Sequence, residues 1–384
     1  MKWSKRLLIL FLIASKLESS TAKKLSTEEN EKRLAHCGTK HQRSKVFNGR
    51  ETNEEEAPWA VQVFSPNSSC TGTLISPRHV STTTHCIAGN DDVEWKNNSL
   101  NYNFDRSKCP KHNHIVITEV LASKVAVLSN KTLIGRGKFL ILFGFCRVAN
   151  EDYFYQYADD FMIIELADDV EYSQTLHPAC VARDTSDNRE NSVLDFYGYG
   201  ENPDRDQKEK PESGGILRFE QTKVIDETPK GTRNRIDPRV FHARSVTEMS
   251  VNCPGDSGGG ATRKIDGRVT VVGTLMRSTC VFMKRGKDAY EVYASVGYHA
   301  KYLCKYTGIC TPPRSSAGEF SILAPLFLLS IVFLAEFEKW PKENRKRAAV
   351  MVKELKLDLE DQEEKGDEKK EEKAVSRVPP VKML

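Results

Sequence analysis

One stretch of this 384-residue chain has the composition of a nucleophile loop. Residues 253–260 read Cys-Pro-Gly-Asp-Ser-Gly-Gly-Gly, so Ser257 stands among glycines that let backbone amides approach a substrate carbonyl closely. A serine hydroxyl alone is a weak nucleophile and needs a histidine base and a carboxylate that holds the tautomer of that histidine. Ser257 is therefore a candidate nucleophile for acyl transfer.

Both partners have candidates upstream of Ser257. Residues 82–86 read Thr-Thr-Thr-His-Cys, which places His85 beside a cysteine that could limit its movement. Asp160 begins the stretch Asp-Phe-Met-Ile-Ile-Glu-Leu, where a carboxylate entering an apolar strand requires a charged or hydrogen-bonding partner. An imidazolium is such a partner, so the sequence predicts a site made of His85, Asp160 and Ser257.

A β-rich fold is expected to position these residues. From about residue 46 to residue 295, short β-branched or aromatic stretches alternate with turn residues, which predicts strands at 59–64, 269–275 and 290–296. A helix is predicted over 296–306, where apolar residues share one face at spacings of three and four. We expect an all-β domain with flanking segments.

The order and surroundings of His85, Asp160 and Ser257 resemble the chymotrypsin and trypsin family of serine proteases. The resemblance covers roughly residues 46–306 and extends to Pro-Trp-Ala-Val, Gly-Tyr-Gly and Val-Tyr motifs at 58–61, 198–200 and 292–293. It implies two six-stranded antiparallel β-barrels of the chymotrypsin fold followed by a C-terminal helix. The closing segment 304–310 looks most like a divergent trypsin-like group from nematodes, in which some members are inactive.

The resemblance also implies a reaction. His85 would act as the base, Asp160 would orient it, and Ser257 would attack a peptide carbonyl. The amides of Gly255 and Ser257 would stabilise the oxyanion. The expected activity is that of a serine endopeptidase acting on protein or peptide substrates, with no metal and no cofactor. The alternative is a catalytically inactive homologue that acts as an extracellular or membrane-tethered binding protein.

The same resemblance implies a route of activation. Residues 45–49, Lys-Val-Phe-Asn-Gly, resemble the family's activation site, which implies a zymogen that an activating protease cleaves after Lys45. The freed ammonium of Val46 would then pair with the buried carboxylate of Asp256 and order the oxyanion loop.

Two residues of the expected specificity pocket depart from the family pattern. Val251 stands where trypsin-like members carry an aspartate, so trypsin-like cleavage is not expected, and an apolar base would favour apolar or small side chains. Glu291 replaces the usual glycine of the pocket wall and could attract a cation or block access. Segment 273–280 also lacks the family's Ser-Trp-Gly, although main-chain pairing with a substrate does not require it.

Ten cysteines form an even set that can pair completely in an oxidising compartment. The resemblance implies the disulfides Cys70–Cys86, Cys253–Cys280 and Cys37–Cys180, the last of which would keep the cleaved propeptide attached. Three pairings remain open for the other four cysteines, and proximity in sequence favours Cys109–Cys146 and Cys304–Cys310.

The N-terminus predicts export. Residues 1–22 place basic residues ahead of a short apolar stretch, and small residues at Ser20 and Ala22 indicate signal-peptide cleavage after Ala22. A propeptide at 23–45 and a protease domain at 46–310 follow from this interpretation.

Three glycosylation triplets agree with that route, at Asn67, Asn97 and Asn130. The interval between His85 and Asp160 is longer than the family usually allows, so we expect an insertion of exposed loops at about 90–154, where glycans would shield the substrate cleft or simply decorate the surface. The net charge of +4 is mild and no dense basic stretch is interleaved with aromatics, which excludes nucleic acid as an expected partner.

A linker is expected at 311–319, followed by a candidate transmembrane helix at 320–337 and a charged tail at 338–384. Basic residues follow the apolar segment directly, which predicts a single-pass type I membrane protein with the protease domain outside. The alternative is a buried helix in a C-terminal extension of a secreted protein. We expect the tail to be disordered or a solvated helix.

Overall fold

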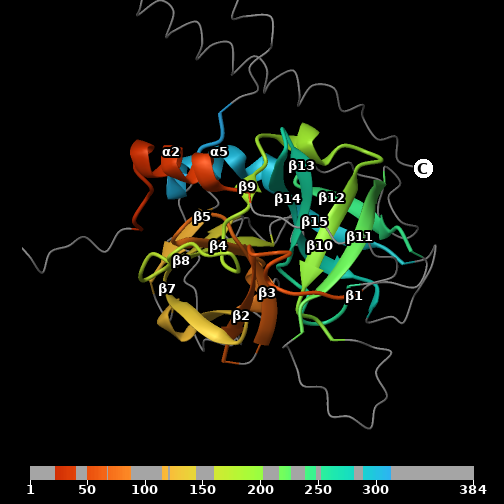
Figure 1. The fold of residues 1–384 in the computed structure, drawn as a ribbon, viewed down its shortest axis with the longest axis horizontal. Helices are drawn as coiled ribbons and strands as arrows, with labels where there is room; N and C mark the ends of the chain where they lie inside the picture. Colours follow the sequence, from red (N-terminus) through yellow and green to blue (C-terminus); the bar gives the residue numbers. More distant parts are fainter. Residues whose placement is uncertain are drawn as a thin grey trace, which may run out of the picture. The chain divides into compact units, whose positions relative to one another are not determined.

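The computed structural model describes residues 22–39, 50–66, 68–87, 115–119, 122–143, 160–201, 216–225, 238–247, 252–280 and 289–312. This part of the chain folds into two β-barrels with two α-helices outside them (Figure 1). Each barrel closes on itself, so neither leaves a long open edge that could pair with another chain.

Six strands form the first barrel in the order β7, β6, β2, β3, β4 and β8, and the pairing of β7 with β8 closes the ring. β5 pairs with β7 beside the ring. Alternate residues such as Leu140 and Leu142, or Met162 and Ile164, point inward and are at most 1% exposed. The bounds are β2 (Ala60–Ser65), β3 (Ser68–Leu74), β4 (His79–Thr82), β5 (Ile115–Thr118), β6 (Ala126–Ser129), β7 (Thr132–Phe143) and β8 (Phe161–Leu166).

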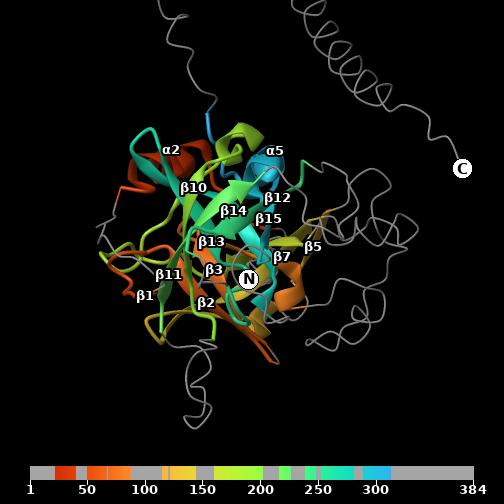
Figure 2. The ribbon, with the colours of Figure 1, turned by 90° about the vertical axis from the view of Figure 1, so that its right-hand side faces the viewer.

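The second barrel follows the order β11, β10, β13, β14, β15 and β12, and the pairing of β11 with β12 closes it. Four of these strands, β10, β11, β13 and β14, can be followed in Figure 2. Aromatic side chains fill much of its core, and Phe241 stacks on Tyr293 with ring centroids 5.2 Å apart. The bounds are β1 (Arg50–Glu51), β9 (Cys180–Val181), β10 (Val193–Gly198), β11 (Arg218–Ile225), β12 (Val240–Ser245), β13 (Gly260–Ile265), β14 (Arg268–Ser278) and β15 (Glu291–Ser295).

The two six-stranded antiparallel barrels and the C-terminal helix expected from the resemblance are confirmed. The predicted helix appears as α5 (Val296–Thr307). Gly308 caps its C-terminal end, because glycine readily adopts the left-handed φ of +72° that ends the helix. The expectation of exposed loops throughout 90–154 is wrong for 115–119 and 122–143. These residues supply β5, β6 and β7, and Val127, Leu140 and Leu142 of β6 and β7 belong to the apolar core of the first barrel.

A second helix, α2 (Thr27–His36), lies within the segment that we predicted only as a propeptide. A capping box starts it: the Ser26 hydroxyl accepts a hydrogen bond from Glu29 N at 3.1 Å, and the Glu29 carboxylate accepts one from Ser26 N at 2.7 Å. The signal that would have revealed this helix is the Ser-x-x-Glu spacing of these two residues.

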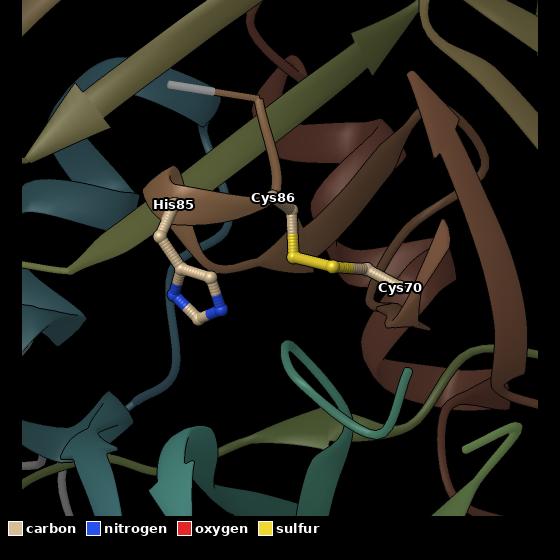
Figure 3. Close-up of side chains that lie close together, drawn as sticks. All are labelled: Cys70, His85 and Cys86. Atoms are coloured by element: carbon tan, nitrogen blue, oxygen red, sulfur yellow. A yellow bond between two sulfur atoms is a disulfide. The ribbon is translucent and has the colours of Figure 1, made fainter. Parts of the chain in front are cut away.

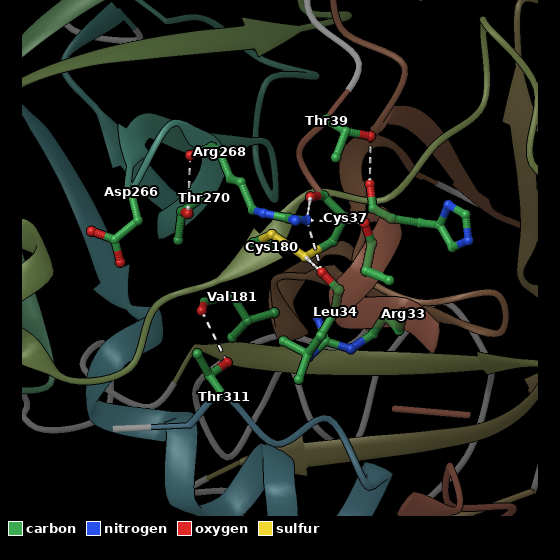
Figure 4. The surroundings of a disulfide bond; sticks show 12 residues. Arg33, Leu34, Cys37, Thr39, Cys180, Val181, Asp266, Arg268, Thr270 and Thr311 are labelled. Carbon is green, nitrogen blue, oxygen red and sulfur yellow. Dashed lines mark hydrogen bonds between the residues drawn. A yellow bond between two sulfur atoms is a disulfide. The ribbon is translucent and has the colours of Figure 1, made fainter. Parts of the chain in front are cut away.

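Helix α2 is bonded to the second sheet through residues of β14 and β9. Arg268 donates through Nη1 to three carbonyls at its C-terminal end, those of Leu34, Ala35 and Cys37, at 2.8–3.2 Å (Figure 4). A cation at this end offsets the helix dipole and satisfies carbonyls that lack helical partners. The disulfide between Cys37 and Cys180 lies beside this contact. The segment 22–39 is therefore an integral part of the folded domain.

Four disulfides connect described residues: Cys37–Cys180, Cys70–Cys86, Cys253–Cys280 and Cys304–Cys310. The first three are those implied by the resemblance, and the fourth, Cys304–Cys310, is the pair favoured by proximity in sequence. Cys109 and Cys146 lie outside the described residues, as do almost all of the predicted signal peptide, the activation segment 45–49 and residues 313–384. Within the described ranges, no helix has the length and apolar character needed to cross a membrane.

Candidate active site

His85 and Asp160 meet where two paired strands of the first barrel end. His85 lies in a short 3₁₀ turn, η1 (Thr84–Cys86), that follows β4, and Asp160 directly precedes β8. Antiparallel pairing of β4 with β8 brings these two ends side by side. The sequence therefore places the two side chains together through strand register.

The Asp160 carboxylate contacts His85 at two positions. Its Oδ2 lies 2.6 Å from His85 Nδ1, and its Oδ1 accepts a hydrogen bond from the His85 backbone N–H at 2.9 Å. Asp160 is 2% exposed, whereas the His85 side chain is 30% exposed. This contact favours the tautomer with the proton on Nδ1, which makes Nε2 the basic nitrogen of the ring.

Ser257 follows a tight turn made by residues 253–256. Asp256 N donates to Cys253 O at 3.0 Å, and Gly255 has a φ of +97° after Pro254. Proline followed by a glycine with positive φ is typical of a type II turn. Within the described part of the chain, the amides of Gly255 and Ser257 have no hydrogen-bond partner, so the turn presents two donors beside a serine hydroxyl.

Thr71 on β3 holds this nucleophile loop against the first barrel. Its backbone N–H donates to Ser257 O at 2.9 Å, and its hydroxyl donates to Gly255 O at 2.8 Å. The same hydroxyl accepts from Tyr199 N at 3.0 Å, and Thr71 is 0% exposed. Sequence reasoning missed this residue, since no local pattern indicates a contact between residues 184 positions apart.

A disulfide braces the histidine next to this loop. Figure 3 shows the Cys70–Cys86 bond beside the His85 ring, and Cys86 Sγ lies 3.8 Å from Ser257 O. Ser257 is thus adjacent to the His85 turn, although its hydroxyl forms no hydrogen bond with His85 among the described residues. Catalytic hydrogen bonds often form only when substrate is bound.

Cys70, His85 and Cys86 place one sulfur or ring-nitrogen atom each within 4.8 Å of one another, as the ligands of a metal site do. Both sulfur atoms are joined in the disulfide, however, so neither is a thiolate that could bind a metal. The Cys70–Cys86 disulfide therefore has a structural part, since it ties the turn that carries His85 to β3.

Asp256 lies in a space that two glycines leave open. Its carboxylate accepts hydrogen bonds from Gly200 N and Cys253 N, both at 2.8 Å. A Cβ at Gly198 or Gly200 would lie 2.1 or 2.3 Å from this carboxylate, which explains the Gly-Tyr-Gly motif. Burial raises the pKa of Asp256 to about 6, because the described residues supply hydrogen bonds but no ion pair.

Glu291 points into the core of the second barrel and is 1% exposed. Its carboxylate accepts hydrogen bonds from Asn252 Nδ2 at 2.9 Å and from the Tyr293 hydroxyl at 2.8 Å. Burial is the main cause that raises its pKa to about 7. Both sequence-based expectations for Glu291, attraction of a cation and blocked access, stay predictions.

The remaining candidate residues divide into two groups. Asn130 is exposed at the tip of the β6–β7 hairpin, where Asn130 and Lys131 both have positive φ values, as in a type I′ turn. The others lie outside the described residues: Lys45, Val46, Asn67, Asn97 and Val251.

Comparisons with known proteins agree with this architecture. A family model described as the nematode trypsin-6-like family matches residues 7–310. A venom serine protease of Polistes dominula is 24% identical over 240 residues, which are 61% of this chain and 74% of that protein. The CLIP domain-containing serine protease B15 of Anopheles gambiae is 24% identical over 260 residues, which are 62% of this chain and 64% of that protein.

A shorter match adds a third relative. Phenoloxidase-activating factor 1 of Holotrichia diomphalia is 39% identical over 59 residues, which are 14% of this chain and 16% of that protein. The chain thus covers less than two thirds of the length of two of these three relatives. The family match, by contrast, covers most of the chain and includes both barrels. This chain belongs to the nematode trypsin-6-like family of serine protease-like proteins.

Proposed function

We propose that this protein is a serine endopeptidase that hydrolyses peptide bonds through an acyl-enzyme on Ser257. The observation that carries the proposal is the pairing of His85 with a buried Asp160 next to a loop that presents two unpartnered amides. An acyl-transfer site needs these parts: a base with a defined tautomer, a nucleophile and donors for the oxyanion.

The reaction assigns one step to each part. His85 Nε2 removes the hydroxyl proton as Ser257 Oγ attacks the peptide carbonyl carbon, and the negative charge that develops on the carbonyl oxygen accepts hydrogen bonds from the Gly255 and Ser257 amides. The protonated histidine, stabilised by Asp160, then gives its proton to the leaving amine. A water molecule then attacks the ester carbon, with His85 again acting as the base, which releases the acid product and restores the serine.

Cleavage after Lys45 is proposed to switch the site on. The Val46 ammonium would supply a cation for Asp256, whose carboxylate is buried and bonded only to neutral amides among the described residues. Asp256 lies between Gly255 and Ser257, so its position directly affects both oxyanion donors. The Cys37–Cys180 disulfide and the docked helix α2 would keep the N-terminal segment attached after cleavage.

An exported protein is the proposed context for this chemistry. Four disulfides favour an oxidising compartment, and the exposed Asn130 turn is accessible for glycosylation. Relatives named as a CLIP-domain serine protease and a phenoloxidase-activating factor support protein substrates and an activating protease as partners. The membrane span at 320–337 stays a prediction.

A fluorophosphonate probe tests the proposal directly, since it labels only an activated serine nucleophile. The protein cleaved after Lys45 is compared with Ser257→Ala and with Ser186→Ala, a control at an exposed serine of η4 (Thr185–Asn188). We expect labelling of the parent and of the control but not of Ser257→Ala. A folded, cleaved parent that takes up no probe would refute peptidase activity and favour the inactive binding homologue.

A further inference from the structure

The N-terminal segment makes one contact that neither catalysis nor activation uses. The backbone N–H of Lys23 donates a hydrogen bond to Glu165 Oε1 at 2.9 Å, across 142 positions of sequence. Glu165 lies on β8, and only 1% of its surface is exposed. The contact is set in place by the chain that follows, since Leu25 N donates to Thr307 O at 2.8 Å and Leu25 is buried.

The Glu165 carboxylate is short of partners for a buried charge. Its Oε2 has no hydrogen-bond partner among the described residues, and His79 Nε2, 4.0 Å away, has none there either. Burial raises the pKa of Glu165, and the side chains of Lys138, Arg78 and Lys23 oppose this only through charge, without an ion-pair contact among the described residues. Burial lowers the pKa of His79 to about 3, so this ring is neutral and supplies no charge. Arg78, the residue before His79, is buried but already bonded to Glu29 and Asp169 at 2.6 Å.

One backbone amide does not balance a buried carboxylate, which normally requires a cation or several donors. The amide that contacts Glu165 belongs to the residue directly after Ala22, where the N-terminal sequence predicts removal of the signal peptide. The cleavage site predicted from the sequence and the hydrogen bond found in the structure therefore involve the same atom, the backbone nitrogen of Lys23.

We propose that the exported chain begins at Lys23 and that its α-ammonium is the buried counter-ion of Glu165. Hydrolysis of the Ala22–Lys23 bond by the export peptidase adds one water and leaves a carboxylate on Ala22 and an ammonium on Lys23. The nitrogen that donates one hydrogen bond as an amide then carries a positive charge and three N–H groups. These groups satisfy Oε1 and reach toward Oε2, and the end of the chain is locked to β8.

The proposed ion pair between the Lys23 α-ammonium and Glu165 does not depend on the proposed peptidase activity, so the two proposals can be tested separately. The exported full chain is prepared in the Ser257→Ala background, and its first residue is determined by N-terminal sequencing, with Lys23 expected. The α-amine is then labelled with 2-pyridinecarboxaldehyde under native conditions, and the rate is compared with that of Glu165→Gln. Glu171→Gln, at an exposed position, is the matched control.

We expect the α-amine to react at least about tenfold faster in Glu165→Gln than in the parent or the control, since a buried ion pair withholds the free amine. A chain that carries one glycine ahead of Lys23 leaves every side chain intact and should unfold at a temperature several degrees lower in the parent, with a smaller loss in Glu165→Gln. A different first residue, equal labelling rates or equal losses on glycine extension would overturn the proposal.

Discussion

Replacing Glu291 with glutamine removes a buried ionisable group while keeping its shape. The new amide oxygen can accept the hydrogen bond from Asn252 Nδ2, and the amide nitrogen can donate to the Tyr293 hydroxyl. Glutamine thus resembles the neutral, protonated carboxyl, which also offers one acceptor oxygen and one donor to these partners, so comparison with the parent reports the effect of the Glu291 charge.

The size of that effect follows from the raised pKa of Glu291. Its value of about 7, against 4.5 for an ordinary glutamate, corresponds to about 3 kcal/mol, since each tenfold change in proton affinity is worth about 1.4 kcal/mol. The folded state binds this proton more tightly than the unfolded chain does. The contribution to stability is therefore fully present below about pH 4.5 and is lost as the pH rises to about 7.

Urea unfolding followed by tryptophan fluorescence, with disulfides intact, measures the outcome. Glu291→Gln should match the parent at pH 4 and exceed its free energy of unfolding by about 3 kcal/mol at pH 8. Glu171→Gln, at an exposed position, should follow the parent at both pH values. Asp256 titrates in the same direction and is present in all three proteins, and its charge is one of the causes that raise the pKa of Glu291. A difference between Glu291→Gln and parent that does not change with pH would refute a buried, protonated Glu291.

Three further predictions concern the active site. Thr71→Val removes the hydroxyl bonded to Gly255 and Tyr199. We expect kcat/KM for ester hydrolysis to be about 10- to 100-fold lower than that of the parent, with the unfolding midpoints of both proteins measured as the control. Gly258→Ala should destabilise the fold by about 1–3 kcal/mol more than Gly267→Ala in urea unfolding, because a Cβ at Gly258 would lie 2.3 Å from Thr71 O whereas Gly267 has open space at a similar φ. Asp160→Asn should lower kcat about 10⁴-fold in a peptide-substrate assay without changing the circular dichroism spectrum, and a loss below tenfold would contradict its role in holding the histidine tautomer.

Much of the site could be predicted because its residues carry local signals. Ser257 stands in a glycine-rich loop, and His85 precedes a cysteine whose partner the resemblance indicated. Asp160 opens an apolar strand, where a carboxylate needs a partner. These patterns are set by residue type and short spacing, so the amino-acid sequence alone is enough to reveal them.

Contacts between distant segments were not predictable in this way. Nothing around Thr71 indicates that it positions the nucleophile loop, because both of its bonds to that loop cross from one barrel to the other. Glu291 was expected on a pocket wall, and only the closure of the second barrel shows that its carboxylate is enclosed by Asn252 and Tyr293. The partners of such residues are determined by strand register.

The sequence by itself determined the family resemblance, the candidate site residues and the position of the C-terminal helix, since each depends on spacing along the chain. Tertiary structure alone decided which buried charges have partners. Lys23 and Glu165 meet across 142 residues, and Asp256 fits only because Gly198 and Gly200 have no side chains. Burial and hydrogen bonding depend on how segments pack in space, and that packing is what sets the electrostatics of this protein.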